Sequence, residues 1–109
     1  MSDQVTLNVD ETPHAVVVRV GGVVDALSLA DVSRGLSDAQ AGSVPVVVDL
    51  SGVTFMDSRG LGGLLAANER SREGAAPLRI YRPSDPVRRL IDVSGVGEVL
   101  VEVSEIPEG

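Results

Sequence analysis

A short, almost wholly apolar run at residues 44–50, Val-Pro-Val-Val-Val-Asp-Leu, places the strongest limit on the fold of this chain. A run of this length between turn signals is typical of a strand covered on both faces. Pro45 lies at its start, where a missing backbone N–H does least harm to a sheet. Parallel strands need crossover connections, usually helices, so helical segments should flank this run.

The rest of the sequence alternates between strand-like and helix-like patterns. Apolar and polar residues alternate at 5–9, and residues 15–20 are nearly continuous β-branched sequence ending at Gly21 and Gly22, which predicts an antiparallel hairpin. Three helices are predicted, with N-caps or first turns at Ser28, at 57–60 and at 84–86, and with ends near Gly42, Arg72 and Gly95. Further extended segments are predicted at 53–56, after an interruption at Ser51 and Gly52, at 78–81 and at 99–103.

This order, ββαβαβαβ, predicts an α/β fold. Its strand-helix-strand crossovers imply a mostly parallel, mixed β-sheet with three main helices, to which the N-terminal hairpin adds an antiparallel edge. No linker, internal repeat or low-complexity segment divides the sequence. We therefore expect a single domain over residues 1–109, with residues 104–109 as a flexible tail.

The composition excludes several kinds of chemistry. The chain has no cysteine and no lysine, and its one histidine, His14, lies in the predicted first turn. Disulfides, thiolate metal sites and Walker-type phosphate loops are therefore impossible. A serine triad would need a histidine from the wrong end of the domain, and the acidic residues show no metal-ligand spacing. We predict a protein that is not an enzyme and that holds no metal or cofactor.

The charge limits the partners. The chain has 16 acidic and 9 basic residues, for a formal net charge of -7. Such a chain is repelled by phosphate backbones and anionic membranes, so we predict no nucleic-acid partner. Its apolar runs are too short to span a membrane, and Asp3 stands where a signal peptide would carry basic residues. We expect a soluble, cytoplasmic protein without stable membrane insertion.

The most unusual local chemistry lies at residues 49–65, Asp-Leu-Ser-Gly-Val-Thr-Phe-Met-Asp-Ser-Arg-Gly-Leu-Gly-Gly-Leu-Leu. Gly60, Gly62 and Gly63 fall in the first turns of a predicted helix, where each glycine costs about 1 kcal/mol relative to alanine. One explanation is close packing of the helix on the sheet, or a cap. The other is that the glycines let a partner backbone or a ligand approach Ser58.

Ser58 lies at the amino end of this predicted helix. Free N–H groups and the helix dipole stabilise an anion there, so the helix would tolerate a phosphate on the Ser58 hydroxyl. Asp57 would repel that phosphate, whereas Arg59 could pair with it. From the residues alone, the more ordinary interpretation is that Ser58 or Asp57 is simply the N-cap.

The segment from Asp49 to Leu65, taken with Gly22-Val23-Val24-Asp25, resembles the signature of the STAS domain family. In its small bacterial members, the anti-sigma factor antagonists (anti-anti-sigma factors), a strand ending in D-L-S-x-V-x-F-M-D-S leads into G-L-G-x-L-L at a helix start. The order of elements and the segment at 88–95 are also similar, so the resemblance covers essentially the whole chain and implies a STAS-like fold.

The resemblance implies a phosphorylation switch. The unphosphorylated protein would bind an anti-sigma factor with serine kinase activity, which would release a sigma factor. That kinase would phosphorylate the protein, and a PP2C-type phosphatase would remove the phosphate. Carried onto this sequence, the phosphoacceptor is Ser58, with Asp57 before it. Asp25 matches an acidic position near the phosphorylation site, and Gly60 and Leu61 match positions that line the partner contact.

Arg59 departs from the family pattern, because the residue after the serine is usually small or hydroxyl-bearing. It could pair with the phosphate and blunt the switch, or select a particular kinase. A second interpretation within the family is an unphosphorylated docking subunit of a transporter complex. A third, phosphotransfer through Asp57 as in receiver domains, lacks the clustered acids and the lysine of that chemistry.

Overall fold

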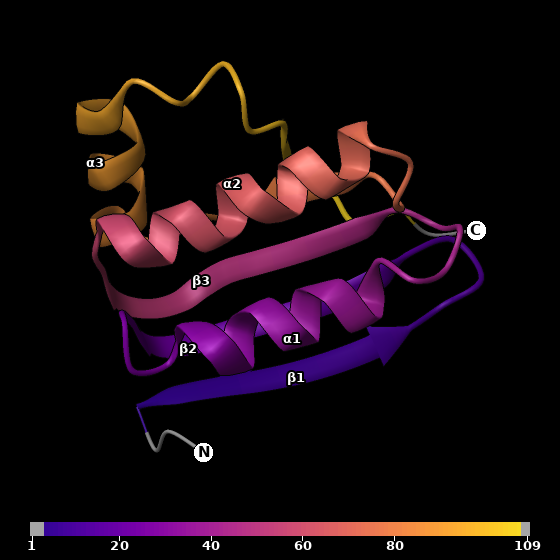
Figure 1. The fold of residues 1–109 in the computed structure, drawn as a ribbon, viewed down its shortest axis with the longest axis horizontal. Helices are drawn as coiled ribbons and strands as arrows, with labels where there is room; N and C mark the ends of the chain where they lie inside the picture. The colour runs from indigo at the N-terminus through magenta and orange to yellow at the C-terminus, as the bar shows by residue number, and fades with distance from the viewer. Residues whose placement is uncertain (1–3, 108–109) are drawn as a thin grey trace.

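The computed structural model describes residues 4–107. Its five strands form one sheet in the spatial order β1-β2-β3-β4-β5 (Figure 1). The strands are β1 (Val5–Glu11), β2 (Val16–Val24), β3 (Val46–Met56), β4 (Leu78–Tyr81) and β5 (Glu102–Val103), and the helices are α1 (Leu29–Ala39), α2 (Ser58–Arg72) and α3 (Asp85–Ser94). β1 pairs with β2 antiparallel, and every other neighbouring pair is parallel. The predicted α/β fold, its element order and its antiparallel N-terminal hairpin are confirmed.

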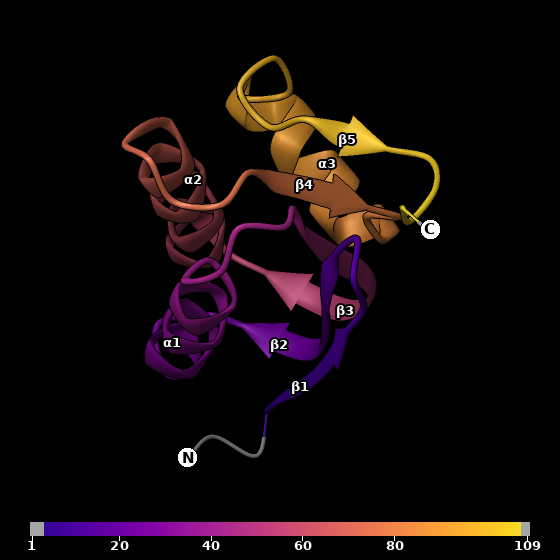
Figure 2. The same ribbon diagram turned by 90° about the vertical axis from the view of Figure 1, so that its right-hand side faces the viewer.

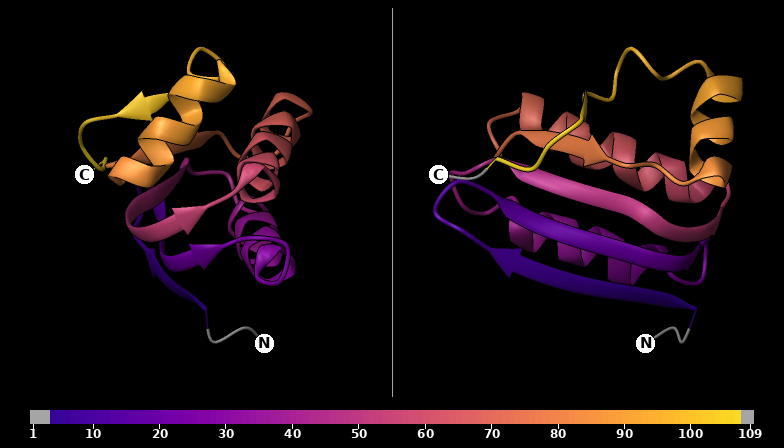
Figure 3. Two further views of the ribbon diagram at one scale, coloured as in Figure 1. Left: turned by 90° about the vertical axis from the view of Figure 1, so that its left-hand side faces the viewer. Right: turned by 180° about the vertical axis from the view of Figure 1, so that it is seen from behind.

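Helices α1 and α2 lie side by side on one face of the sheet (Figures 2 and 3). The main core fills the space between them and the strands, where Val18, Val48, Leu36 and Leu64 are almost completely buried. The amphipathic spacing of the helices and the β-branched strands together explain this layer, because each element buries one apolar face.

The opposite face of the sheet carries a second, smaller apolar cluster. Ala15, Val17 and Val47 are buried there, with Tyr81, Val103 and Ile106 packed against them. The start of β3 is therefore covered on both faces, as its apolar run predicts, by helices on one side and by C-terminal side chains on the other. The flexibility predicted for residues 104–109 stays a prediction, and residues 108–109 lie outside the described residues.

Strand β3 differs from its prediction. The two extended segments at 44–50 and 53–56 are one eleven-residue strand, so the expected interruption at Ser51 and Gly52 is wrong. The pairing with β2 shifts twice, and each shift adds one extra residue on β3. These bulges place Leu50, Val53 and Met56 in the core at a spacing of three instead of two. Each bulge breaks the alternation of faces, which is why the pattern resembled a turn.

The last strand and two of the helix caps also differ from expectation. β5 contains only two residues, because the Val99 and Leu100 N–H groups turn back to the Val96 carbonyl. Ser28 and Ser84 stand at the N-cap positions of α1 and α3, but neither side chain makes a capping hydrogen bond. The Ser28 hydroxyl is fully buried and instead donates to the Val23 carbonyl at 2.8 Å.

Gln40 follows the last residue of α1, which ends before the expected Gly42. Its buried side chain donates from Nε2 to the Ala67 carbonyl at 2.8 Å and to the Ser71 hydroxyl at 3.0 Å, and its Oε1 accepts from Arg70 Nε at 3.1 Å. One amide thus joins the carboxyl end of α1 to the last turns of α2. This arrangement fixes the two helices relative to each other over the sheet.

Candidate functional site

The junctions β2-α1 and β3-α2 lie at the same end of the sheet (Figure 1). Neighbouring parallel strands bring their carboxyl ends together, and in open α/β sheets this is where binding sites form. The two junctions are joined directly, because the Asp57 N–H donates to the Val24 carbonyl at 3.2 Å. We call this surface, comprising residues 25–28 and 57–62, the junction site.

Asp57 is the N-cap of α2. Its backbone is extended, and its Oδ1 accepts hydrogen bonds from the N–H groups of Arg59 and Gly60, both at 3.0 Å. A carboxylate in this position stabilises the helix start by satisfying free N–H groups and by meeting the positive end of the dipole. The choice between Asp57 and Ser58 as the cap is therefore decided in favour of Asp57.

Ser58 is the first residue of α2, and it is exposed. Among residues 4–107, no hydrogen-bond partner engages its hydroxyl. Arg59 is exposed beside it and forms no ion pair with a described residue. The capping role of Asp57 therefore leaves the Ser58 hydroxyl accessible to a partner or a modifying enzyme.

Asp25 organises the neighbouring junction. Its Oδ1 accepts from the N–H groups of Leu27 at 3.0 Å and Ser28 at 3.3 Å, and its own N–H donates to the Ser28 hydroxyl at 3.0 Å. No hydrogen bond joins Asp25 to Ser58 among the described residues. Asp25 follows Val24, whose carbonyl accepts the Asp57 N–H, and the Asp25 carboxylate holds its own turn.

The three glycines of α2 have different surroundings. A Cβ on Gly60 would lie 2.5 Å from the Val24 carbonyl oxygen, and a Cβ on Gly63 would lie 2.7 Å from Leu29 Cδ1. Gly62 is exposed, and a Cβ there would meet nothing within 4 Å. Close packing therefore explains Gly60 and Gly63, whereas it does not explain Gly62.

Two of the predicted partner contacts are buried. Gly60 packs on Val24, and the Leu61 side chain is 3% exposed within the main core. The exposed part of the amino end of α2 is formed by Ser58, Arg59 and Gly62. Beside it, Leu27 is 74% exposed. Leu27 is missed by sequence analysis, because a single apolar residue in the turn before a helix carries no signal that its side chain is exposed.

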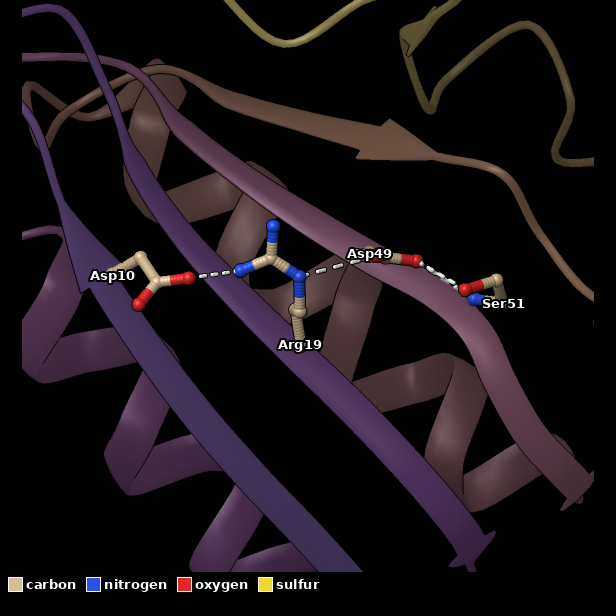
Figure 4. A network of polar contacts seen from close by, with 4 residues as sticks. All are labelled: Asp10, Arg19, Asp49 and Ser51. Carbon is tan, nitrogen blue, oxygen red and sulfur yellow. Dashed lines mark hydrogen bonds and ion pairs between the residues drawn. The ribbon is translucent and has the colours of Figure 1, made fainter.

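Asp49, the first residue of the motif, lies away from the junction site, on the face of the sheet opposite α1 and α2. Arg19 pairs there with Asp10 and, from Nε at 3.6 Å, with Asp49 Oδ2 (Figure 4). Asp49 Oδ1 accepts from the Ser51 N–H at 2.9 Å and from its hydroxyl at 2.7 Å. This network joins three strands next to a bulge of β3, so Asp49 has a structural role.

Within residues 4–107, the acidic and histidine side chains form no group of three or more that could hold a metal ion. No helix in that part of the chain has the length and apolar character needed to cross a membrane. The junction site presents an exposed hydroxyl, a guanidinium and an apolar side chain, beside the carboxylates of Asp25 and Asp57.

The fold is that of a small α/β domain with a mixed sheet, and its two adjacent βα junctions form one site at its surface. The family model described as "Mlab, STAS domain" matches residues 7–102, and the chain belongs to the STAS domain family.

Known proteins are similar to this chain in sequence or in structure. An anti-sigma-B factor antagonist of Listeria monocytogenes is 28% identical over 101 residues, which cover 92% of this chain and 88% of the relative. An anti-sigma factor antagonist from Mycobacterium paratuberculosis has a similar structure, with a TM-score of 0.83 at 24% identity over 97% of this chain and 91% of that one.

The anti-sigma factor antagonist SpoIIAA has been solved in two states. Its unphosphorylated form is similar to this chain with a TM-score of 0.73 at 25% identity, over 92% of this chain and 90% of SpoIIAA. The phosphorylated form of the Bacillus protein has a TM-score of 0.68 at 24% identity, over 92% of this chain and 93% of SpoIIAA. Both forms share the fold of this chain.

Proposed function

We propose that this chain is an anti-sigma factor antagonist that binds an anti-sigma factor through the junction site while Ser58 is unphosphorylated. The anti-sigma factor is the serine kinase that phosphorylates Ser58, and a PP2C-type phosphatase removes the phosphate. Supporting this proposal are the family, the names of the relatives, and SpoIIAA, a similar protein with a phosphorylated form.

One structural observation carries the proposal. The Ser58 hydroxyl is exposed and unengaged at the first turn of α2, because the carboxylate of Asp57 already satisfies the N–H groups of that turn. In the reaction, the Ser58 oxygen would form a bond to the γ-phosphorus of ATP held by the kinase. The bond from that phosphorus to the bridging oxygen would break, ADP would leave, and the hydroxyl proton would pass to a base or water.

The expected effect on binding is electrostatic. A phosphate adds a charge of about -1.5 to -2 at neutral pH, next to the Asp57 carboxylate and on a chain with a net charge of -7. Burying such a dianion in an interface is costly unless it is paired. The α2 helix would remain folded, because its cap is the side chain of Asp57. The modification would therefore change the surface and leave the fold intact.

The test combines mass spectrometry with binding. Incubation with ATP and each purified ATP-dependent anti-sigma factor of the source genome should add one phosphate, which fragmentation should place on Ser58. Ser58→Ala should bind the cognate factor like the unphosphorylated protein, and Ser58→Asp should bind at least about tenfold more weakly. The matched control is Ser104→Asp, at an exposed serine beyond β5. Equal affinities of the two Ser58 variants would refute the switch.

Arg59 favours a second candidate function, the unphosphorylated docking subunit of a transporter complex. A long, exposed cation directly after the serine departs from the pattern of the phosphorylated family members. This candidate predicts copurification with transporter components and no labelling by any anti-sigma kinase. Phosphate on Ser58 would exclude it in favour of the switch.

A further inference from the structure

We propose that Leu27 and Arg59 form a two-point recognition element that selects the cognate anti-sigma factor, with Leu27 filling an apolar depression and Arg59 pairing with a carboxylate of that partner. This inference rests on the proposed function, whose site it extends by naming the chemistry that the partner must present.

Leu27 is presented in a fixed position. It is 74% exposed, yet its N–H donates to Asp25 Oδ1 at 3.0 Å, and the adjacent Ser28 is completely buried. The Ser28 hydroxyl holds the turn by donating to the Val23 carbonyl and accepting from the Asp25 N–H. A leucine on an ordered backbone loses little further conformational entropy when it is buried by a partner.

Leu27 and Arg59 lie on neighbouring parts of the junction site. Gly63 packs against Leu29, which is two residues beyond Leu27. Arg59 is four residues before Gly63 and therefore shares its face of α2. Since α1 and α2 lie side by side (Figure 2), this face of α2 is the one turned toward α1, and the turn carrying Leu27 immediately precedes α1.

Arg59 is the only basic residue of the junction site, whose two carboxylates, Asp25 and Asp57, both accept hydrogen bonds from backbone N–H groups of their own loops. Arg59 remains as an exposed cation at the second helical position, where the helix dipole disfavours positive charge. A residue kept there against helix stability is explained by a negatively charged group on the partner.

Exposure of an apolar side chain does not by itself mark a binding residue, as Val93 shows. It is 81% exposed on α3, and single exposed apolar residues are normal. What distinguishes Leu27 is its ordered turn and the place of that turn, at the junction that adjoins the amino end of α2. Val93 and the exposed Arg89, four residues before it, therefore provide matched controls on a different surface.

The experiment measures affinity for the cognate anti-sigma factor, together with KM and kcat for its phosphorylation of Ser58. Leu27→Ala and Arg59→Glu should each weaken binding about tenfold, and should raise KM with kcat unchanged, because they remove contacts made equally before and during phosphoryl transfer. The loss in Arg59→Glu should shrink at high salt. Val93→Ala and Arg89→Glu should bind like the wild type, and circular dichroism should show all four variants folded.

The outcomes separate the two proposals. If the wild type binds and Ser58→Asp does not, but Leu27→Ala and Arg59→Glu bind like their α3 controls, the recognition element is refuted and the switch stands. If the wild type binds none of the anti-sigma factors of its genome, both proposals fail. Loss of binding in all four variants would also refute the element, because the effect would then not be local to the junction site.

Discussion

Gly60 packs directly on Val24: a Cβ at Gly60 would lie 2.5 Å from the Val24 carbonyl oxygen and 2.8 Å from its Cγ1. The same carbonyl accepts the N–H of Asp57, the cap of α2. This contact brings the two βα junctions together, and it needs a residue without a side chain. The distance between the α2 helix and the end of β2 is therefore fixed by one glycine.

Gly60→Ala should destabilise the fold by about 1–3 kcal/mol, because the atom that the new methyl meets is backbone and cannot rotate away. Chemical denaturation at equilibrium would measure the loss. Gly63→Ala is the matched control, since its nearest atom is the mobile end of Leu29, so its cost should be smaller. A Gly60→Ala protein as stable as the Gly63→Ala protein would contradict the contact.

Gly62→Ala should act in the opposite direction. A Cβ there meets nothing within 4 Å, so the substitution should stabilise the protein by about 1 kcal/mol through helix propensity alone. The same methyl group would stand on the exposed surface beside Ser58, and affinity for the cognate anti-sigma factor should fall. Thermal unfolding and a binding titration would measure the two effects. A more stable variant with unchanged affinity would leave Gly62 without a role in partner approach.

Gln40→Leu should destabilise the protein by about 2 kcal/mol, because the carbonyl of Ala67 and the Nε of Arg70 lose a buried partner. The control is Asn68→Ala, which removes one exposed amide hydrogen bond to the Val99 carbonyl and should cost less than about 1 kcal/mol. Urea denaturation would compare the two. Similar losses in both variants would show that Gln40 does not join the helices.

The ion pair between Arg88 and Glu102 joins α3 to β5 at 2.7 Å, with nearly half of each side chain exposed. The hydrogen bond to Glu102, followed by the charge of Glu102, raises the pKa of Arg88 above its ordinary value. The interactions that raise this pKa stabilise the folded state at every pH below the pKa of the unfolded arginine. Their contribution is lost only at a pH above that value. Arg88 therefore adds no pH dependence between neutral and mildly alkaline solution.

Glu102→Gln should accordingly lower the free energy of unfolding by less than about 1 kcal/mol, as is usual for an exposed pair. The difference from the wild type should be the same at neutral and at mildly alkaline pH, and smaller at high salt. Denaturation curves under these conditions would check it. A difference that disappears on going to mildly alkaline pH would contradict the raised pKa of Arg88.

Much of the fold follows from short stretches of sequence. The N-terminal hairpin, the helix after Asp57 and the strand at 78–81 are all present, because apolar periodicity and turn residues act on near neighbours. The end predicted for the second strand at Gly21 and Gly22 is wrong, since β2 continues to Val24. The predictions that are wrong concern features that depend on contacts between residues far apart in the sequence or on the packing of a turn. The bulges of β3 depend on pairing with β2, and the Ser28 hydroxyl turns to the Val23 carbonyl instead of capping α1.

The same distinction between local sequence and tertiary contacts applies to the junction site. The sequence by itself determined that a serine would stand at the start of a glycine-rich helix, because the motif, its turn and its helix are contiguous. Only the tertiary structure decided that Asp57 is the cap, that Gly60 and Gly63 pack while Gly62 is open, and that Leu27 is exposed in the turn before α1. These properties depend on which atoms of β2, α1 and α2 come within a few ångströms of one another, and a local pattern of residue types does not contain that distance.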